Sequence, residues 1–116
     1  MTTILACDLG GSGLRAALVT ETGAFAGETF VPLPVPLDGA TSEVDPDLWW
    51  GAFETAAGHL RREAAGPFAA LAAVAISGMT RTQVFLDTSG RPVRPAITWR
   101  DTRAAEVAAR LADVPG

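Results

Sequence analysis

The stretch DLGGSGLRAAL, from Asp8 to Leu18, decides how this 116-residue chain begins to fold. An acidic residue ends the apolar run Ile4–Asp8, three glycines follow between Gly10 and Gly13, and a second apolar run, Leu14–Thr20, comes next. Two apolar runs of strand length on either side of a glycine cluster predict a β-hairpin. We therefore expect the chain to open with two paired strands joined by a tight glycine turn.

The rest of the chain alternates strand and helix patterns. Ala24–Val31 predicts a third strand, which the prolines after it should end because proline cannot donate to a strand ladder. Asp45 before Pro46 is a typical helix start, and we expect that helix to stop at Gly66-Pro67. The continuous apolar run Leu71–Ile76 predicts a strand buried on both faces.

Two further strands and a helix complete the predicted order. Gln83–Leu86 and Ala96–Trp99 are expected to form the arms of a hairpin, and a last helix should begin near Asp101 or Thr102 and run through Leu111. The order is three strands, helix, buried strand, strand pair, helix, which is typical of an α/β fold with a mixed sheet.

The glycine hairpin carries a chemical hypothesis. Closely spaced glycines expose successive backbone amides, which can bind phosphate oxygens without a lysine. Asp8 would then be placed to hold Mg²⁺ beside the phosphates, and Arg15 could add donors. A glycine-rich turn without a ligand is the open alternative. A dinucleotide fold is disfavoured, because only seven residues separate Gly13 from the Glu21-Thr22-Gly23 turn, too few for the required helix.

Composition excludes several classes of function. All 9 basic residues are arginine, so neither a Walker-type phosphate loop nor a Schiff-base lysine can be present. A net charge of −4 makes nucleic acid an improbable partner. One cysteine and one histidine exclude a disulfide framework and paired-histidine metal sites. No apolar run is long enough for a membrane helix, and the N-terminus lacks the pattern of a secretion signal, which favours the cytoplasm.

Four motifs in order resemble the N-terminal part of the FGGY family of carbohydrate kinases, with xylulokinases the nearest subgroup. They are DLGGSGLRAAL (8–18), EVDPDLWWGAF (43–53), AISGMTRTQVFLDTSG (75–90) and RPAITWRDTRA (94–104). The resemblance implies the first part of a ribonuclease-H-like domain of the actin, hexokinase and Hsp70 kind. It implies ATP-dependent phosphorylation of a sugar or polyol hydroxyl, with a homodimer of the full-length protein as a candidate assembly and no nucleic acid or membrane partner.

The resemblance also assigns site residues. Asp8 would hold Mg²⁺, and the ATP phosphates would be bound by Gly10, Gly11, Ser12 and Gly13 with Arg15 nearby. The sugar would lie against Thr80, Arg81, Trp99, Arg100 and Asp101. The catalytic aspartate of the family lies far downstream of these motifs. Residues 1–116 are therefore expected to be an incomplete N-terminal portion of the kinase domain, inactive alone.

Departures from the family motifs leave the substrate open. Thr80 and Arg81 replace the Met-His pair that xylulokinases place against the sugar, and Arg100 replaces an asparagine. Two arginines near the expected pocket favour an acidic substrate as the alternative to a neutral sugar or polyol. Ordinary structural roles for both arginines remain open. A chain that works as a non-catalytic binding module also remains an open alternative.

Overall fold

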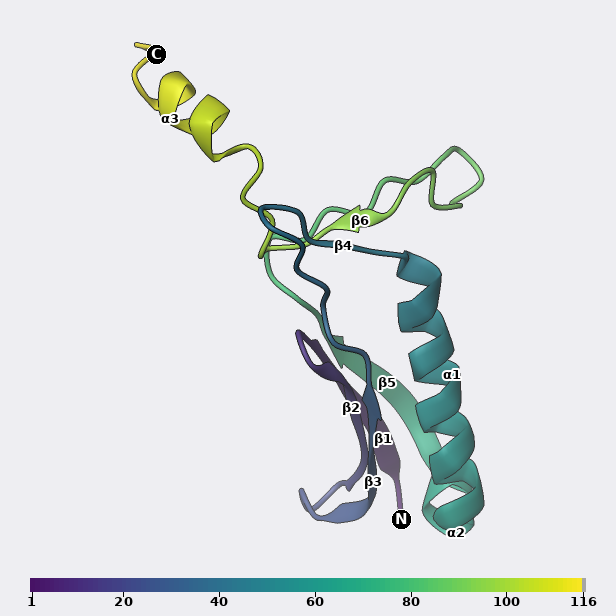
Figure 1. The fold of residues 1–116 in the computed structure, drawn as a ribbon. Helices are drawn as coiled ribbons and strands as arrows, with labels where there is room; N and C mark the ends of the chain where they lie inside the picture. The colour runs from purple at the N-terminus through teal and green to yellow at the C-terminus, as the bar shows by residue number, and fades with distance from the viewer. Residues whose placement is uncertain (116) are drawn as a thin grey trace.

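The main sheet holds the four longest strands of the chain in the order β3-β2-β1-β5. A computed structural model describes residues 1–115 (Figure 1). Strands β1 (Thr3–Gly10), β2 (Gly13–Thr20) and β3 (Phe25–Pro32) form an antiparallel meander, and β5 (Leu71–Ser77) runs parallel to β1. The glycine hairpin, the third strand and the later strand predicted from the sequence are all confirmed.

Helix α1 (Pro46–Glu63) covers one face of this sheet and makes the core. Its first turn is capped as predicted, because Oδ1 of Asp45 accepts a hydrogen bond from the Asp47 amide at 3.0 Å. The helix packs on β2 and β3. The core joins alternate residues of the strands to one stripe of the helix, namely Leu5, Cys7, Leu14, Ala16, Leu18, Ala52, Ala56 and Leu60.

The predicted end of the first long helix is wrong by a few residues. Helix α1 ends at Glu63, and Gly66-Pro67 lie inside a second short helix, α2 (Ala65–Ala69). The break occurs at Ala64, whose φ of −131° is not helical. Pro67 fits because it lies in the first turn of α2, where a backbone N–H has no intrahelical acceptor to lose.

Strand β5 is present as predicted, but the expectation that both its faces are buried is wrong for residues 1–115. Val74 and Ile76 are 48% and 65% exposed. The strand lies at the edge of the sheet, next to β1. Helix α1 packs on β2 and β3, which lie on the opposite side of β1 from β5. Its apolar sequence therefore meets no second layer within the described part of the chain.

The predicted hairpin of Gln83–Leu86 and Ala96–Trp99 forms only in part. Gln83 and Ile97 exchange both backbone hydrogen bonds, at 2.9 and 3.0 Å, and Leu86 bridges Pro92. The regular strand here is only β6 (Ala96–Ile97), and it pairs with β4 (Glu43–Val44), an unpredicted partner. Pro92 and Pro95 interrupt the longer ladder because neither has an N–H to donate.

The last helix begins later than predicted. Helix α3 spans Ala105–Ala112, since the residues expected to start it make tertiary contacts instead. The amide of Thr102 donates to the Ala40 carbonyl at 2.9 Å, and Asp101 binds another loop. Figure 1 shows α3 extending away from the sheet at the C-terminal end. Within residues 1–115, no helix combines the length and apolar character needed to cross a bilayer.

Candidate functional site

The turn between β1 and β2 is a two-residue loop made of Gly11 and Ser12. The strands pair up to Gly10 and Gly13, which face each other across the hairpin. The two turn carbonyls are occupied, because Gly11 accepts from the Val35 amide and Ser12 from the Leu33 amide, both at 2.9 Å. The amides of Gly11 and Ser12 themselves have no hydrogen-bond acceptor among residues 1–115. The turn thus offers two consecutive donors to a ligand.

Glycine is required at the end of this turn. Gly13 has a φ of +150°, and a methyl group on its Cα would collide with the Val31 carbonyl oxygen and lie 2.8 Å from the Leu33 nitrogen. The chain leaving β3 therefore passes directly against the hairpin. This close approach allows the Leu33 and Val35 amides to fix the carbonyls of the turn.

Asp8 and Arg15 lie directly opposite each other in the β1–β2 ladder. Both are exposed, on the face of the sheet away from α1, because their neighbours along the strands point into the core. The Arg15 guanidinium lies over the ring of Phe30, 5.6 Å from its centroid. No group of three metal-ligating side chains occurs within residues 1–115, so Asp8 could contribute one carboxylate to a cation.

A hollow of about 470 Å³ opens beside the C-terminal loop. It is lined by side chains of both predicted sugar segments, namely Arg81, Gln83, Ile97, Thr98, Trp99, Asp101, Arg103 and Ala104. Trp99 is half-exposed. Its indole also reaches the phosphate hairpin, since a methyl group on the Gly11 Cα would lie 3.9 Å from its Cζ2 atom. The two predicted subsites are therefore contiguous.

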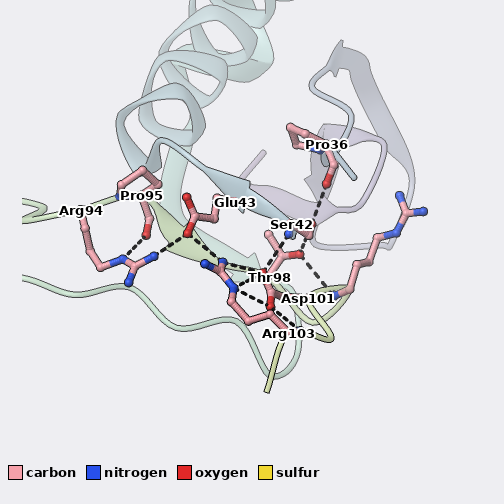
Figure 2. Close-up of polar contacts among 9 residues, drawn as sticks. Pro36, Ser42, Glu43, Arg94, Pro95, Thr98, Asp101 and Arg103 are labelled. Carbon is pink, nitrogen blue, oxygen red and sulfur yellow. Dashed lines mark hydrogen bonds and ion pairs between the residues drawn. The ribbon is translucent and has the colours of Figure 1, made fainter. Parts of the chain in front are cut away.

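Asp101 is tied into a network that holds the loop of the hollow (Figure 2). Its carboxylate accepts from the Ser42 amide at 2.8 Å and from Nε and Nη2 of Arg103 at 2.9 and 2.6 Å. Arg103 also donates to Glu43 at 2.7 Å. The hydrogen bonds from Arg103 and then from Ser42 hold the pKa of Asp101 well below its usual range. Asp101 is thus an anchor for the loop, and its side chain is only 4% exposed.

A buried pair of hydroxyls lies behind this network. The hydroxyls of Ser42 and Thr98 are 2.6 Å apart, and that of Ser42 donates to the Pro36 carbonyl at 2.6 Å. Both residues are almost fully buried. Figure 2 shows the resulting junction of three segments, namely the one at Pro36, the residue directly before β4 and the residue directly after β6. Sequence reasoning missed both residues, because a serine and a threonine 56 positions apart carry no local signal of contact.

The structure separates the five predicted sugar residues. Arg81, Trp99 and Asp101 line the hollow, whereas Thr80 and Arg100 do not. Thr80 lies exposed in the turn before Arg81. Arg100 directs its Nη1 to the Val35 carbonyl at 3.4 Å. Arg100 therefore supports the segment that follows β3, the same segment that fixes the glycine turn.

A second hollow, of about 270 Å³, lies between the start of α1 and the edge of the sheet. Its lining consists of Cys7, Leu9, Leu14, Pro46, Trp49, Trp50, Phe53 and Ile76. Burial raises the pKa of the Cys7 thiol, so the thiol stays neutral. A wall without polar partners cannot recognise the hydroxyls of a sugar, so we place the candidate site at the hollow beside Trp99.

This chain is similar to known proteins in both sequence and fold. Residues 3–115 match the N-terminal domain of the FGGY family of carbohydrate kinases. Xylulose kinases of Lactococcus lactis and Streptomyces coelicolor are 32% identical over 97% of this chain and 42% identical over 67% of it. A structure of a xyloylose kinase from Brucella ovis superposes with a TM-score of 0.85, 36% identity and 95% of this chain covered. The matched stretch spans 23%, 15% and 24% of these three proteins.

Proposed function

This chain belongs to the FGGY family of carbohydrate kinases, and we propose from that membership that it forms part of an enzyme that transfers the γ-phosphate of ATP to a hydroxyl of a sugar or polyol. In this proposal residues 1–116 make up the first portion of the N-terminal domain. The aspartate that deprotonates the acceptor hydroxyl in such kinases has no counterpart in the motifs of this chain. We therefore expect the chain alone to bind ligands without turning them over.

One observation carries the proposal: the free amides of the glycine turn lie next to the wall of the hollow. Gly11 contributes an unoccupied N–H and is also the residue that Trp99 approaches. Phosphoryl transfer depends on holding the acceptor and the phosphate in line while the charge on the phosphate is neutralised. A sugar against Trp99 and a phosphate on the Gly11–Ser12 amides would lie side by side, as that reaction requires.

The roles follow from this placement. We assign the phosphates to the backbone of Gly10, Gly11, Ser12 and Gly13, with Arg15 adding positive charge from the neighbouring sheet face. Asp8 fits a Mg²⁺ ion that is held mainly by phosphate oxygens and water, because Mg²⁺ commonly takes only one or two carboxylates from a protein. Such an ion would neutralise phosphate charge.

On the substrate side, we assign Trp99 to the carbon skeleton of the sugar and Arg81 to its polar groups. Asp101 and Arg100 then act one step away, by holding the loop and the segment after β3. Thr80 would set the turn that presents Arg81. The family resemblance suggests a cytoplasmic enzyme and, for the complete kinase, a homodimer, and both stay predictions.

The test is a kinase assay on the native protein, purified from its own cells and identified by intact mass. We expect ATP-dependent phosphorylation of at least one member of a panel of ketoses, polyols and sugar acids, with no product when Mg²⁺ is chelated. A matched pair of variants adds detail. Gly11→Pro removes one turn amide, whereas Gly11→Ala keeps that amide and adds only a methyl group, 3.9 Å from Cζ2 of Trp99. A normal KM for ATP in the Gly11→Pro variant would contradict the role of the turn.

A further inference from the structure

Three charged side chains line the hollow beside Trp99, and two of them neutralise each other. Asp101 and Arg103 form an ion pair at 2.6 Å, and Arg103 is also paired with Glu43 at 2.7 Å. Arg81 makes neither a hydrogen bond nor an ion pair with any residue in the range 1–115. The guanidinium of Arg81 therefore leaves the hollow with one positive charge that no side chain among residues 1–115 compensates.

The backbone of Arg81 adds a second, independent observation. Its φ is +45°, and among residues 1–115 it is the only residue other than glycine with a positive φ. The left-handed region is unfavourable for an arginine and easy for glycine or asparagine. The hydroxyl of Thr82 donates to the Thr80 carbonyl at 3.1 Å and closes the turn around it. Strained residues of this kind persist where the surrounding structure holds them in place, and they cluster at active sites and ligand sites.

We propose that the acceptor substrate is a polyhydroxy carboxylic acid, and that Arg81 binds its carboxylate inside the hollow. This inference rests on the proposed kinase function and names the substrate class for the same site. A guanidinium recognises a carboxylate through two parallel hydrogen bonds, which a neutral ketose cannot offer. Trp99 supplies an apolar wall for the carbon chain and leads toward the free amides of Gly11 and Ser12.

The second arginine considered from the sequence does not share this role. Arg100 lies outside the lining of the hollow and donates to the Val35 carbonyl. The selectivity for an acid therefore depends on Arg81 alone. A nucleotide phosphate is the other anion that a free guanidinium could bind, so the experiment has to separate a carboxylate on the acceptor from a phosphate on ATP.

The first experiment uses the unmodified native protein. The acceptors are D-gluconate and D-xylonate as acids, with D-xylulose and glycerol as neutral compounds. We expect kcat/KM for the better acid to exceed that for either neutral acceptor by about tenfold or more, which is the worth of one charge-assisted hydrogen bond. Calorimetry of the acids without nucleotide should show binding that the neutral acceptors lack. Neutral acceptors preferred in both measurements would overturn the inference.

The second experiment changes Arg81 without disturbing its backbone. Arg81→Asn and Arg81→Gly both suit a φ of +45°, so we expect neither to lower the melting temperature. We expect both to reduce the ratio of kcat/KM for the acid to that for D-xylulose by about tenfold or more. Arg91→Gln is the control, because Arg91 is an exposed arginine outside the hollow. An unchanged ratio in the Arg81 variants would contradict the inference.

The outcomes distinguish three cases. A rise in KM for ATP that is the same with every acceptor would show that Arg81 binds a nucleotide phosphate, which overturns the acid. Turnover of neutral sugars with no use or binding of acids would overturn the acid and leave the kinase proposal standing. Binding of acids without ATP-dependent turnover of any acceptor would support the Arg81 site and contradict the kinase proposal.

Discussion

The indole of Trp99 lies close to Gly11, although the two residues are far apart in the sequence. A methyl group on the Gly11 Cα would lie 3.9 Å from Cζ2 of Trp99. One residue belongs to the hairpin that we assign to the phosphates and the other to the hollow that we assign to the sugar. Because the two residues lie this close, a substitution at either one should affect ligand binding at the other.

Replacing Trp99 with alanine should weaken sugar binding more than nucleotide binding. A sugar skeleton covering part of the indole would bury roughly 60 Å² of apolar surface, worth about 1.5 kcal/mol, so KM for the acceptor should rise about tenfold. Steady-state kinetics of the native protein with acceptor and ATP varied in turn measures this. Trp50→Ala is the control, since Trp50 is 61% exposed on α1 and lines the other hollow. Equal effects of the two substitutions would contradict the assignment of Trp99.

Alanine at Gly13 should destabilise the fold, while alanine at Gly10 should not. The two glycines face each other across the turn, but only Gly13 has a positive φ and lies against the β3 backbone. We expect Gly13→Ala to cost about 1–3 kcal/mol, as overpacking commonly does. Space is open around Gly10, so its substitution should stay within about 0.5 kcal/mol. Urea unfolding of both variants would decide, and similar midpoints would show that the hairpin tolerates the extra atom.

Asp101→Asn should lower the melting temperature at neutral pH. The difference in melting temperature between this variant and the unmodified protein should become smaller in acid. The folded-state pKa of Asp101 is lowered by Arg103 and Ser42, so its ionised form favours folding above the ordinary carboxyl pKa. That contribution is lost as the pH falls below about 4. Melting curves from pH 7 to pH 3 for Asp101→Asn test this sign. Asp113→Asn is the control, because Asp113 is an exposed residue after α3. A difference in melting temperature that grows as the pH falls would contradict the stabilising role of the ionised Asp101.

The buried hydroxyls of Ser42 and Thr98 should be coupled, so that removing both costs less than the sum of the two single substitutions. Ser42→Ala leaves the Pro36 carbonyl without this donor and the Thr98 hydroxyl with only the Arg100 amide as a partner, which should cost about 1–3 kcal/mol. Adding Thr98→Val should then cost less than it does alone, because the hydroxyl it removes has already lost this partner. A double-mutant cycle by thermal or urea unfolding measures the coupling, with the exposed Ser89→Ala as control. Strict additivity would show that the pair is not coupled.

The strands and helices that were predicted well are those with a complete local pattern. The first hairpin needs only its glycines between two apolar runs, and α1 needs only its cap and its stripe of small and apolar residues. The predicted helix end at Gly66-Pro67 and the predicted helix start near Asp101 were wrong because the local pattern there fits more than one structure. A proline fits the first turn of a new helix, and an aspartate that could cap a helix binds a distant loop instead. Neither choice is visible in the neighbouring residues.

The sequence by itself determined the fold class, the glycine hairpin and the family, because each can be recognised from neighbouring residues or from motifs that occur in a characteristic order. Only the tertiary structure decided which predicted site residues meet. It placed Asp101 on Ser42 and Arg103, directed Arg100 toward Val35, and left Arg81 beside Trp99 without a charged partner among residues 1–115. The physical reason is that these choices depend on contacts between segments that the chain brings together only when it folds, whereas hairpin and helix signals act over a few residues.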